Sequence, residues 1–350
     1  MVENKNCALM KKAILFILIY FISLNVYSLS VNLNDFITPE TFGCVSNDRS
    51  KAINNANALQ KALDYSSRTG KTILFNANAR YYLGHGLIIR DFVNLDFNGS
   101  TLIATDTINV LTLLLPDTKR WNGCLSNCRI ELDKIGKCGI LCQQASKLRI
   151  TNCEVASIGA NAVGIKIDKG FEIFVDNSHF EGWDVNSTGI KIAISDCHFS
   201  DCVMIDCYTA VDNRGSNFFE RIHAWMLPRY IQGSIYFRNR GGGVFLNQCF
   251  CDTYDKAFVV DNICDMHISQ LKLIHNKIMW KEPYDKVNPV VFDFKDDDVA
   301  NKSKISMFDS YIGGLWLGNK ERQVLSKRNN HIVLTNSNVT AIKNPNETRN

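Results

Sequence analysis

The chain has 350 residues, of which 46% are hydrophobic and 21% are charged, and its formal net charge is +4. This composition is ordinary for a globular protein and excludes a low-complexity or disordered chain. The net charge is too small to argue for a nucleic-acid partner, so we expect none.

An apolar segment near the start of the chain predicts export. Residues 13–26 are almost wholly apolar and follow two lysines, and Val26 and Ser28 fit a signal peptidase site. The segment is too short to favour a membrane span, and an uncleaved anchor is the alternative. We expect a signal peptide over residues 1–28, cleaved after Ser28, and a secreted or periplasmic protein with no membrane partner. Translation from Met10 instead of Met1 would preserve this signal.

Residues 29–103 are expected to form an N-terminal cap that contains one helix and the first strands. Asp48 and Ser50 offer N-cap side chains and Gly70 offers a stop, so a helix is predicted over about residues 50–68. Its apolar residues fall on one helical face, at Ile53, Ala56, Leu59 and Leu63. One amphipathic helix before a series of strands is typical of a cap over the open end of an apolar core.

Residues 139–180 contain one pattern twice. Gly139 and Gly164 are 25 residues apart, and so are Cys153 and Ser178. Each unit holds two short apolar, β-branched runs separated by Gly, Asp and Asn, which predicts two strands and two turns. A unit of this length cannot bury its inner face alone, so successive units must stack as the coils of a solenoid.

Both runs recur further along the chain. The second run is centred at Cys128, Cys153, Ser178, Cys197, Ile222, Cys249, Leu271, Ser310 and Ser337. The first run is centred at Gly139, Gly164, Gly189, Ala210, Ser234, Ala257 and Val290. The predicted fold is therefore all-β, a single-stranded parallel β-helix of about nine coils over residues 104–340, followed by a tail over residues 341–350. Two long steps predict insertions at about residues 279–288 and 295–304.

Twelve of the 13 cysteines follow residue 28. Four of them occupy the second-run position, where equivalent side chains of successive coils stack inside the core: Cys128, Cys153, Cys197 and Cys249. We expect buried free thiols there in preference to a metal site, because the sequence has no Cys-x-x-Cys pair. Three close pairs are disulfide candidates in an oxidising compartment: Cys124 with Cys128, Cys138 with Cys142, and Cys202 with Cys207.

The N-terminal motifs resemble those of the pectate-lyase-like superfamily. They are Phe42-Gly43, the helical residues 58–63, the strand after Gly70, Tyr81-Tyr82-Leu83 and residues 93–99. The superfamily includes polygalacturonases, related polysaccharide-degrading enzymes and many phage tailspikes. The resemblance implies a right-handed parallel β-helix that acts on a polysaccharide.

The polygalacturonase catalytic motifs do not carry over to this chain. Gly84-His85-Gly86 is present, but it lies in the cap, and we interpret it as a turn. Asp296-Asp297-Asp298 lies in the late insertion, where a solvated acidic loop is the better interpretation. The resemblance therefore assigns no catalytic residue.

The residues that follow the first runs suggest a site of their own. If the coils are in register, Asp212, Arg238 and Asp261 lie side by side on successive coils, about 5 Å apart per step. A cation between two carboxylates tends to keep both ionised, which suits a base or a nucleophile. Glu220, on the adjoining face, is the candidate general acid.

Further polar and aromatic residues are candidates for substrate binding: Asp168, Arg214, Arg240, His223, Trp225 and Tyr254. The aromatic side chains suit stacking on sugar rings, and the charged ones extend the polar column. The alternative for the residues at coil corners is structural, since Asp and Asn commonly hydrogen-bond the backbone of a turn.

Two functions remain open from the sequence. The first is an exported enzyme, a hydrolase or a lyase, that cleaves the glycosidic bonds of a long polysaccharide in a groove along the β-helix. The second is a non-catalytic β-helix that binds glycan or supports surface attachment. We expect no cofactor, with calcium as the alternative if the reaction is that of a lyase. The identity of the polysaccharide and the oligomeric state are left open.

Overall fold

The computed structural model describes residues 35–115, 124–227, 231–274, 290–313, 324–328 and 332–339. The predicted signal peptide, the insertion at about 279–288 and the tail over 341–350 lie outside these ranges. Within them, no helix is long and apolar enough to cross a membrane.

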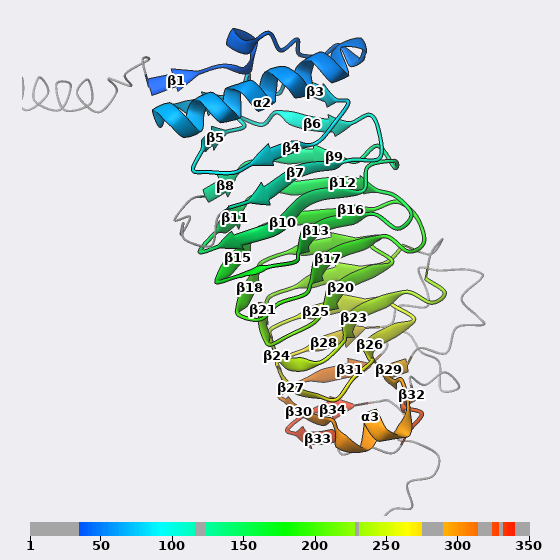
Figure 1. The fold of residues 1–350 in the computed structure, drawn as a ribbon. Coiled ribbons are helices and arrows are strands. Elements are labelled where there is room, and N and C mark those ends of the chain that lie inside the picture. Colours follow the sequence, from blue (N-terminus) through cyan, green and yellow to red (C-terminus); the bar gives the residue numbers. More distant parts are fainter. Residues whose placement is uncertain are drawn as a thin grey trace, which may run out of the picture. The chain divides into compact units, whose positions relative to one another are not determined.

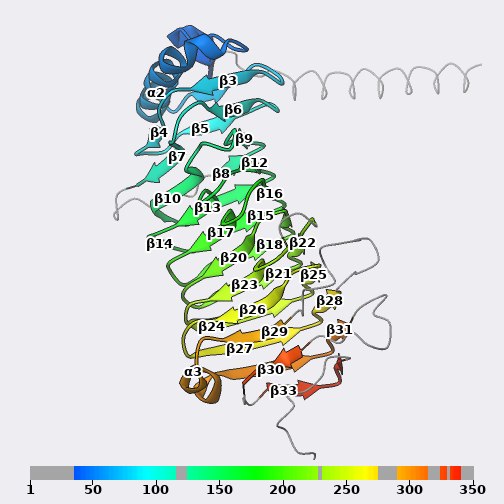
Figure 2. The same cartoon turned by 90° about the vertical axis from the view of Figure 1, so that its right-hand side faces the viewer.

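The described residues from Thr72 onward form one stack of coils, and the coils run through three parallel sheets (Figures 1 and 2). Sheet A contains, in spatial order, β1 (Phe36–Ile37), β2 (Thr72–Leu74), β5 (Asn94–Asp96), β8 (Cys124–Ser126), β11 (Arg149–Thr151), β15 (Ile173–Asp176), β18 (Cys197–Ser200), β21 (Asn217–Glu220), β24 (Gly242–Asn247), β27 (Cys264–Ser269), β30 (Lys304–Phe308) and β33 (Ile332–Thr335). Sheet B contains β3 (Arg80–Leu83), β6 (Thr101–Ala104), β9 (Arg129–Glu131), β12 (Glu154–Ile158), β16 (His179–Gly182), β19 (Val203–Ile205), β22 (His223–Trp225), β25 (Phe250–Asp252), β28 (Lys272–Ile274), β31 (Tyr311–Gly313) and β34 (Asn338–Val339). Sheet C contains β4 (Leu87–Ile89), β7 (Asn109–Leu114), β10 (Cys138–Ser146), β13 (Val163–Ile167), β17 (Thr188–Ile192), β20 (Thr209–Asn213), β23 (Ile235–Asn239), β26 (Lys256–Val260), β29 (Val290–Phe294) and β32 (Val324–Ser326), with the short β14 (Gly170–Phe171) beside β10.

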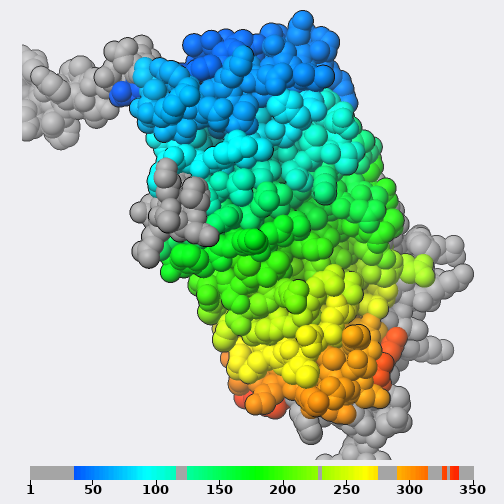
Figure 3. Space-filling model, in the orientation of Figure 1, coloured from blue at the N-terminus to red at the C-terminus, as the bar shows by residue number. Residues whose placement is uncertain are grey.

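These coils confirm the predicted right-handed parallel β-helix of about nine turns. In the space-filling view the coils follow one another in chain order, from cyan through green to yellow (Figure 3). The core is a continuous apolar cluster between the three sheets, so each coil depends on its neighbours for burial.

The number of strands per coil differs from the prediction, because each coil has three strands and not two. The predicted second run is in fact two strands that meet at a sharp corner between sheet A and sheet B. Asn152, between β11 and β12, has φ of 52°, and this left-handed backbone turns the chain within one residue. The sequence stays apolar through the corner, which is why one run was expected.

The same left-handed corner recurs in successive coils. Its residues have φ between 45° and 56°: Asn127, Asn152, Asn177, Asp201, Arg221, Gln248, Gln270, Asp309 and Asn336. Asn and Asp tolerate this conformation better than other residues that carry a side chain. From Asn127 to Asp309, the backbone N–H of each corner still bonds to the next coil, as that of Asn152 does to the Asp176 carbonyl at 3.2 Å.

The residue after the corner points into the core and explains the recurrence of Cys and Ser. The Cys153 thiol donates to the Thr151 carbonyl, two residues back, at 3.4 Å. The Ser178 hydroxyl does the same with the Asp176 carbonyl at 2.8 Å. The predicted place of Cys197 in this column is wrong, because Cys197 opens β18 opposite Ile173. The place belongs to Cys202, which follows the Asp201 corner.

All twelve cysteines of the described ranges are free thiols, so the three proposed disulfide pairs are not formed. Only Cys124 is exposed among these twelve. Burial raises the pKa of the Cys153 and Cys202 thiols to about 12, which leaves almost no thiolate near neutral pH.

We therefore expect a thiol reagent to modify one of these twelve cysteines in the native protein and all twelve after unfolding in denaturant. The measurement is a titration with an aromatic disulfide on protein that lacks residues 1–28, followed by mass spectrometry of the modified peptides. Rapid modification of Cys128 or Cys153 in the native protein would contradict the assigned register.

The predicted cap helix is confirmed as α2 (Ala52–Thr69). It follows a short 3₁₀ helix, η3 (Arg49–Lys51), whose first turn is capped by the Asp48 carboxylate at 2.9 Å from the Ser50 N–H. Another 3₁₀ helix, η2 (Pro39–Phe42), precedes both. The Gln60 side chain accepts from the Ile88 N–H and donates to its carbonyl, each at 2.8 Å. The helix thus supplies hydrogen-bond partners to the backbone at the outer edge of β4, which is the first strand of sheet C.

Two interpretations of short motifs have different outcomes. Gly84-His85-Gly86 is indeed a bend, between β3 and β4. The acidic residues of the late insertion form no loop but a short helix, α3 (Asp297–Lys302), which Asp296 caps by accepting from the Val299 N–H at 2.9 Å. Asp is among the best N-cap residues, so the acidic run marks a helix start. The strands β2 to β6, expected in the cap, already belong to the three sheets.

Candidate functional site

The outer face of sheet C carries two columns of mostly charged side chains. Strand register aligns Asp212 of β20 with Arg238 of β23. The first column is Lys166, Lys191, Asp212, Arg238, Val259 and Asp293. The second lies two residues further along each coil and is Asp168, Ala193, Arg214, Arg240, Asp261 and Lys295. Parallel in-register coils thus turn a spacing in the sequence into a strip of neighbouring charges.

Five residues of these columns are joined by ion pairs, and we call them the sheet C cluster. Asp212 accepts from Arg240 Nε at 2.5 Å and from Nη2 at 3.0 Å, and Lys191 Nζ lies 3.6 Å away. Asp261 accepts from Arg238 Nε at 2.6 Å, and Arg240 Nη1 lies 3.7 Å away. One guanidinium, that of Arg240, therefore bridges the two carboxylates.

The two carboxylates differ in exposure. The Asp212 side chain is 6% exposed and that of Asp261 is 21% exposed. A buried carboxylate is tolerable only when it is paired, and Arg240 supplies a two-point pair to Asp212. The hydrogen bonds to Asp212 raise the pKa of Arg240, so its guanidinium group stays positively charged. Asp212 holds Arg240 in place from beneath, while Asp261 faces the solvent.

Three cations around two carboxylates suit an anionic ligand. Guanidinium groups bind carboxylates with two parallel hydrogen bonds, and Asp261 is exposed enough to accept a proton. Calcium does not fit the cluster, because cationic side chains already occupy both carboxylates. In the described part of the chain, no group of three or more His, Cys, Asp or Glu could hold a metal ion.

The structure brings together four of the residues that the sequence singled out: Asp212, Arg238, Arg240 and Asp261. Lys191 was missed, although the Gly-Ile-Lys-Ile repeat at Gly164 and Gly189 is the signal that could have found it. Asp168, paired with Lys166 at 2.8 Å, and Arg214 lie on the same face of sheet C.

The remaining candidates lie elsewhere. Glu220 ends β21 in sheet A and pairs with Arg221, so it does not adjoin the sheet C cluster as expected. His223 and Trp225 belong to β22 in sheet B. Tyr254 is 4% exposed and donates to the Cys207 carbonyl at 3.1 Å, so its proposed contact with sugar is wrong.

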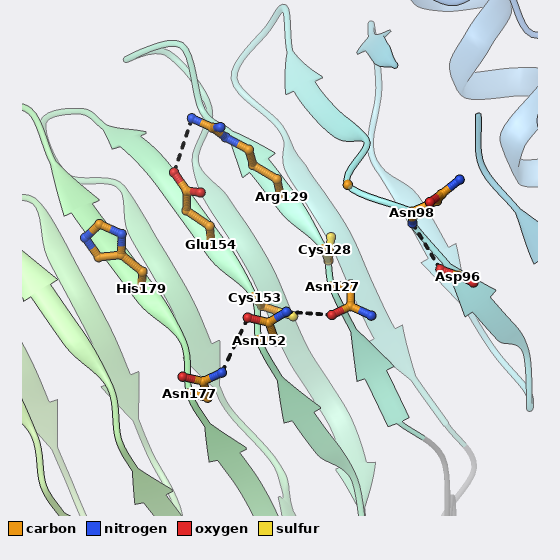
Figure 4. A pocket seen from close by; sticks show the side chains of 11 residues that line it. Asp96, Asn98, Asn127, Cys128, Arg129, Asn152, Cys153, Glu154, Asn177 and His179 are labelled. Carbon is orange, nitrogen blue, oxygen red and sulfur yellow. Dashed lines mark hydrogen bonds and ion pairs between the residues drawn. The ribbon is translucent and has the colours of Figure 1, made fainter. Parts of the chain in front are cut away.

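The sequence also missed a groove of about 430 Å³ on sheet A. Its floor is a stack of parallel rings with centroids 4.6 to 4.9 Å apart, formed by Phe174, His198, Phe218 and Phe245. The rings cover one another's faces and present their edges to solvent, which suits sugar stacking poorly. A second and more polar groove lies at the corner between sheets A and B (Figure 4).

Comparison with known proteins supports the fold. No family model matches the chain, and no curated protein matches it. Solved structures that are similar to it include the following three. A protein of Geobacillus virus E2, ORF18, has a TM-score of 0.55 and 11% identity over 89% of this chain and 63% of its own. The endo-xylogalacturonan hydrolase from Aspergillus tubingensis has a TM-score of 0.54 and 12% identity over 87% and 93%.

The tailspike protein of E. coli bacteriophage HK620 has a TM-score of 0.53 and 10% identity, over 87% of this chain and 66% of its own. This chain thus spans less than two thirds of the virus E2 protein and of the tailspike. Identities this low show the shared architecture and nothing of the activity. They show that the chain has a right-handed parallel β-helix fold, which is the fold that the N-terminal motifs implied.

Proposed function

We propose that the protein is exported, binds an acidic polysaccharide along the outer face of sheet C and cleaves it there by β-elimination. The observation that carries the proposal is the sheet C cluster, in which three cations surround two carboxylates of unequal exposure. The similar solved structures support a glycan ligand, since they include a hydrolase of xylogalacturonan and a phage tailspike. The apolar segment at residues 13–26 supports export.

The two charged columns of sheet C match a polymer of acidic sugars. Six cations stand against four carboxylates: Lys166, Lys191, Arg214, Arg238, Arg240 and Lys295 against Asp168, Asp212, Asp261 and Asp293. Coils are about 4.8 Å apart, so the six coils of this strip span roughly 24 Å. A polymer with one carboxylate on each sugar would present its charges at regular intervals along such a strip.

Elimination needs a proton acceptor and cations that neutralise the uronate carboxylate. The acceptor removes the proton from the carbon next to that carboxylate, the bond from the neighbouring carbon to the leaving oxygen breaks, and a carbon–carbon double bond forms. The leaving oxygen takes up a proton from solvent water. We assign the acceptor role to Asp261, neutralisation to Arg238, Arg240 and Lys191, and the positioning of Arg240 to Asp212.

Hydrolysis fits the sheet C cluster less well. It needs a protonated carboxyl group beside a second, ionised one. Both carboxylates of the cluster are paired with guanidinium groups, and Glu220 lies on another sheet. The second candidate function, glycan binding without cleavage, is favoured by this same full pairing, because it leaves neither carboxylate without a cation.

A polysaccharide panel separates these functions. The purified protein is incubated with acidic and neutral polysaccharides of bacteria and plants, and reducing ends and the absorbance of unsaturated products are followed separately. We expect both signals to rise with an acidic polymer. Reducing ends without absorbance would mean hydrolysis, and binding without either signal would mean a binding protein. Neither binding nor products on any polymer would overturn the proposal.

A further inference from the structure

The corner between sheets A and B is hollowed into a groove of about 590 Å³ (Figure 4). It spans four successive coils, or roughly 14 Å at about 4.8 Å per step. Its lining is mostly polar: Asp96, Asn98, Asn127, Arg129, Asn152, Glu154, Asn177 and His179, together with Gly99, Cys128 and Cys153. This face of the coil is not the face that carries the sheet C cluster.

A difference in corner length creates the hollow. Asp96 pairs with Ser126 and Thr101 pairs with Arg129, so β5 and β6 are in register with β8 and β9. Yet residues 97–100 separate the first two strands, whereas only Asn127 and Cys128 separate the next two. The extra residues of the longer corner must stand out from the stack beside the shorter corners that follow. The groove is therefore encoded in the chain and needs no ligand to form.

Three corner amides run along the floor of the groove as one hydrogen-bonded chain (Figure 4). Asn152 Nδ2 donates to Asn127 Oδ1 at 2.6 Å, and Asn177 Nδ2 donates to Asn152 Oδ1 at 3.4 Å. The chain ends in an amide donor on Asn127 and a carbonyl acceptor on Asn177, neither of which has a partner in the described ranges. Donors and acceptors of fixed direction are thus held at coil spacing.

The walls add charged groups with spare hydrogen-bonding capacity. Arg129 Nη2 lies 3.3 Å from Glu154 Oε1, and the two side chains are 53% and 31% exposed. Asp96 uses one carboxylate oxygen to accept from the Asn98 N–H at 3.0 Å. Nε2 of His179 is buried and has no hydrogen-bond partner among the described residues. His179 itself lines the groove.

We propose that this groove is a second, non-catalytic site that binds a short stretch of neutral sugar units by their hydroxyl groups. Planar amides and carboxylates suit neighbouring hydroxyls, because they offer a donor and an acceptor, or two acceptors, side by side. The lining has two carboxylates and one guanidinium, so it lacks the excess of cations that an acidic sugar would require. It has no Trp, Tyr or Phe, so hydrogen bonds supply the recognition. The inference rests on the proposed function only in taking a glycan as the ligand.

The test uses printed arrays of neutral and acidic oligosaccharides with the wild type and the variant Asn152→Gly. Glycine keeps the left-handed corner and removes the amide that links its two neighbours. We expect the affinity for the bound neutral oligosaccharides to fall about tenfold or more, in line with the loss of one or two hydrogen bonds. The matched control is Asn336→Gly, at an equivalent corner outside the groove, where the amide donates to Asp309 at 2.6 Å. This control is expected to bind as the wild type does.

Failure of this inference is distinct from failure of the proposed function. The proposed sugar site in the groove would be refuted if the wild type bound no neutral oligosaccharide. It would also be refuted if the two glycine variants bound equally. Loss of neutral-sugar binding in Asp212→Asn would place the ligand on sheet C and would also overturn it. Neutral-sugar binding without cleavage of any acidic polymer would leave the groove supported and refute elimination on sheet C.

Discussion

Replacing Asp261 with asparagine is expected to lower kcat for cleavage of the acidic polysaccharide by roughly 10² to 10⁴-fold, the contribution typical of a general base. The substitution keeps the size of the side chain and removes its ability to accept a proton. KM should change little, because Arg238, Arg240 and Lys191 remain to bind the uronate. Initial rates of double-bond formation over a range of polymer concentrations give both parameters.

The matched control for this variant is Asp293→Asn. Asp293 lies in the same charged strip and pairs with Lys256 at 2.5 Å, outside the sheet C cluster. It should retain wild-type kcat. A wild-type rate for Asp261→Asn would refute its role, as would a loss of rate that only accompanies a loss of folded protein in circular dichroism. Asp212→Asn should instead raise KM, since it frees Arg240 from its two-point anchor.

A carboxyl group at the inward position after the corner is expected to destabilise the fold more than any change on the surface. Cys153 is 3% exposed and lies in the core column with Cys128 and Ser178. Cys153→Asp places an unpaired polar or charged group there, and we expect it to lower the free energy of unfolding by about 3–5 kcal/mol. Urea denaturation followed by circular dichroism would show a lower midpoint.

The control is Cys153→Ser, which should cost less than about 1 kcal/mol. Ser178, one coil further on, already donates from this position to the carbonyl two residues back, and its hydroxyl also accepts from the Cys153 N–H at 3.2 Å. A serine at 153 can repeat the same bond to Thr151. Equal destabilisation by Asp and Ser would mean that this position is not inside the core.

The parallel β-helix could be predicted because the sequence pattern repeats with the period of the coils. The 25-residue spacing of Gly139 and Gly164 survives folding as register, since Cys138 pairs with Val163. The predicted register is wrong where the number of residues per coil changes. Ala210 aligns with Tyr236 and not with Ser234, because the segment between β22 and β23 is longer than its counterpart in the previous coil. The spacing of apolar residues alone does not show which connection within a coil contains the extra residues.

Within the candidate site, the sequence could predict only those neighbours that follow from strand register. Asp212 beside Arg238 follows from parallel strands, whereas the bridge from Arg240 to both carboxylates depends on the direction of long side chains. Glu220 was placed near them because two strands per coil would put it on the adjoining face. With three strands per coil, it lies instead at the end of β21 in sheet A. The corner groove had no signal in residue type, since it arises from a difference of two residues in corner length.

The unpaired thiols have a consequence for how the chain reaches its folded state. No cross-link formed in the described ranges is needed to complete the fold, so the chain should fold equally well in a reducing cytosol. In an oxidising compartment, oxygen or oxidising enzymes can join the thiols of the unfolded chain into non-native disulfides. Folding prevents this for the eleven thiols that become buried. Refolding from denaturant should therefore give its highest yield with a reductant present, the reverse of the behaviour of secreted proteins held together by disulfides.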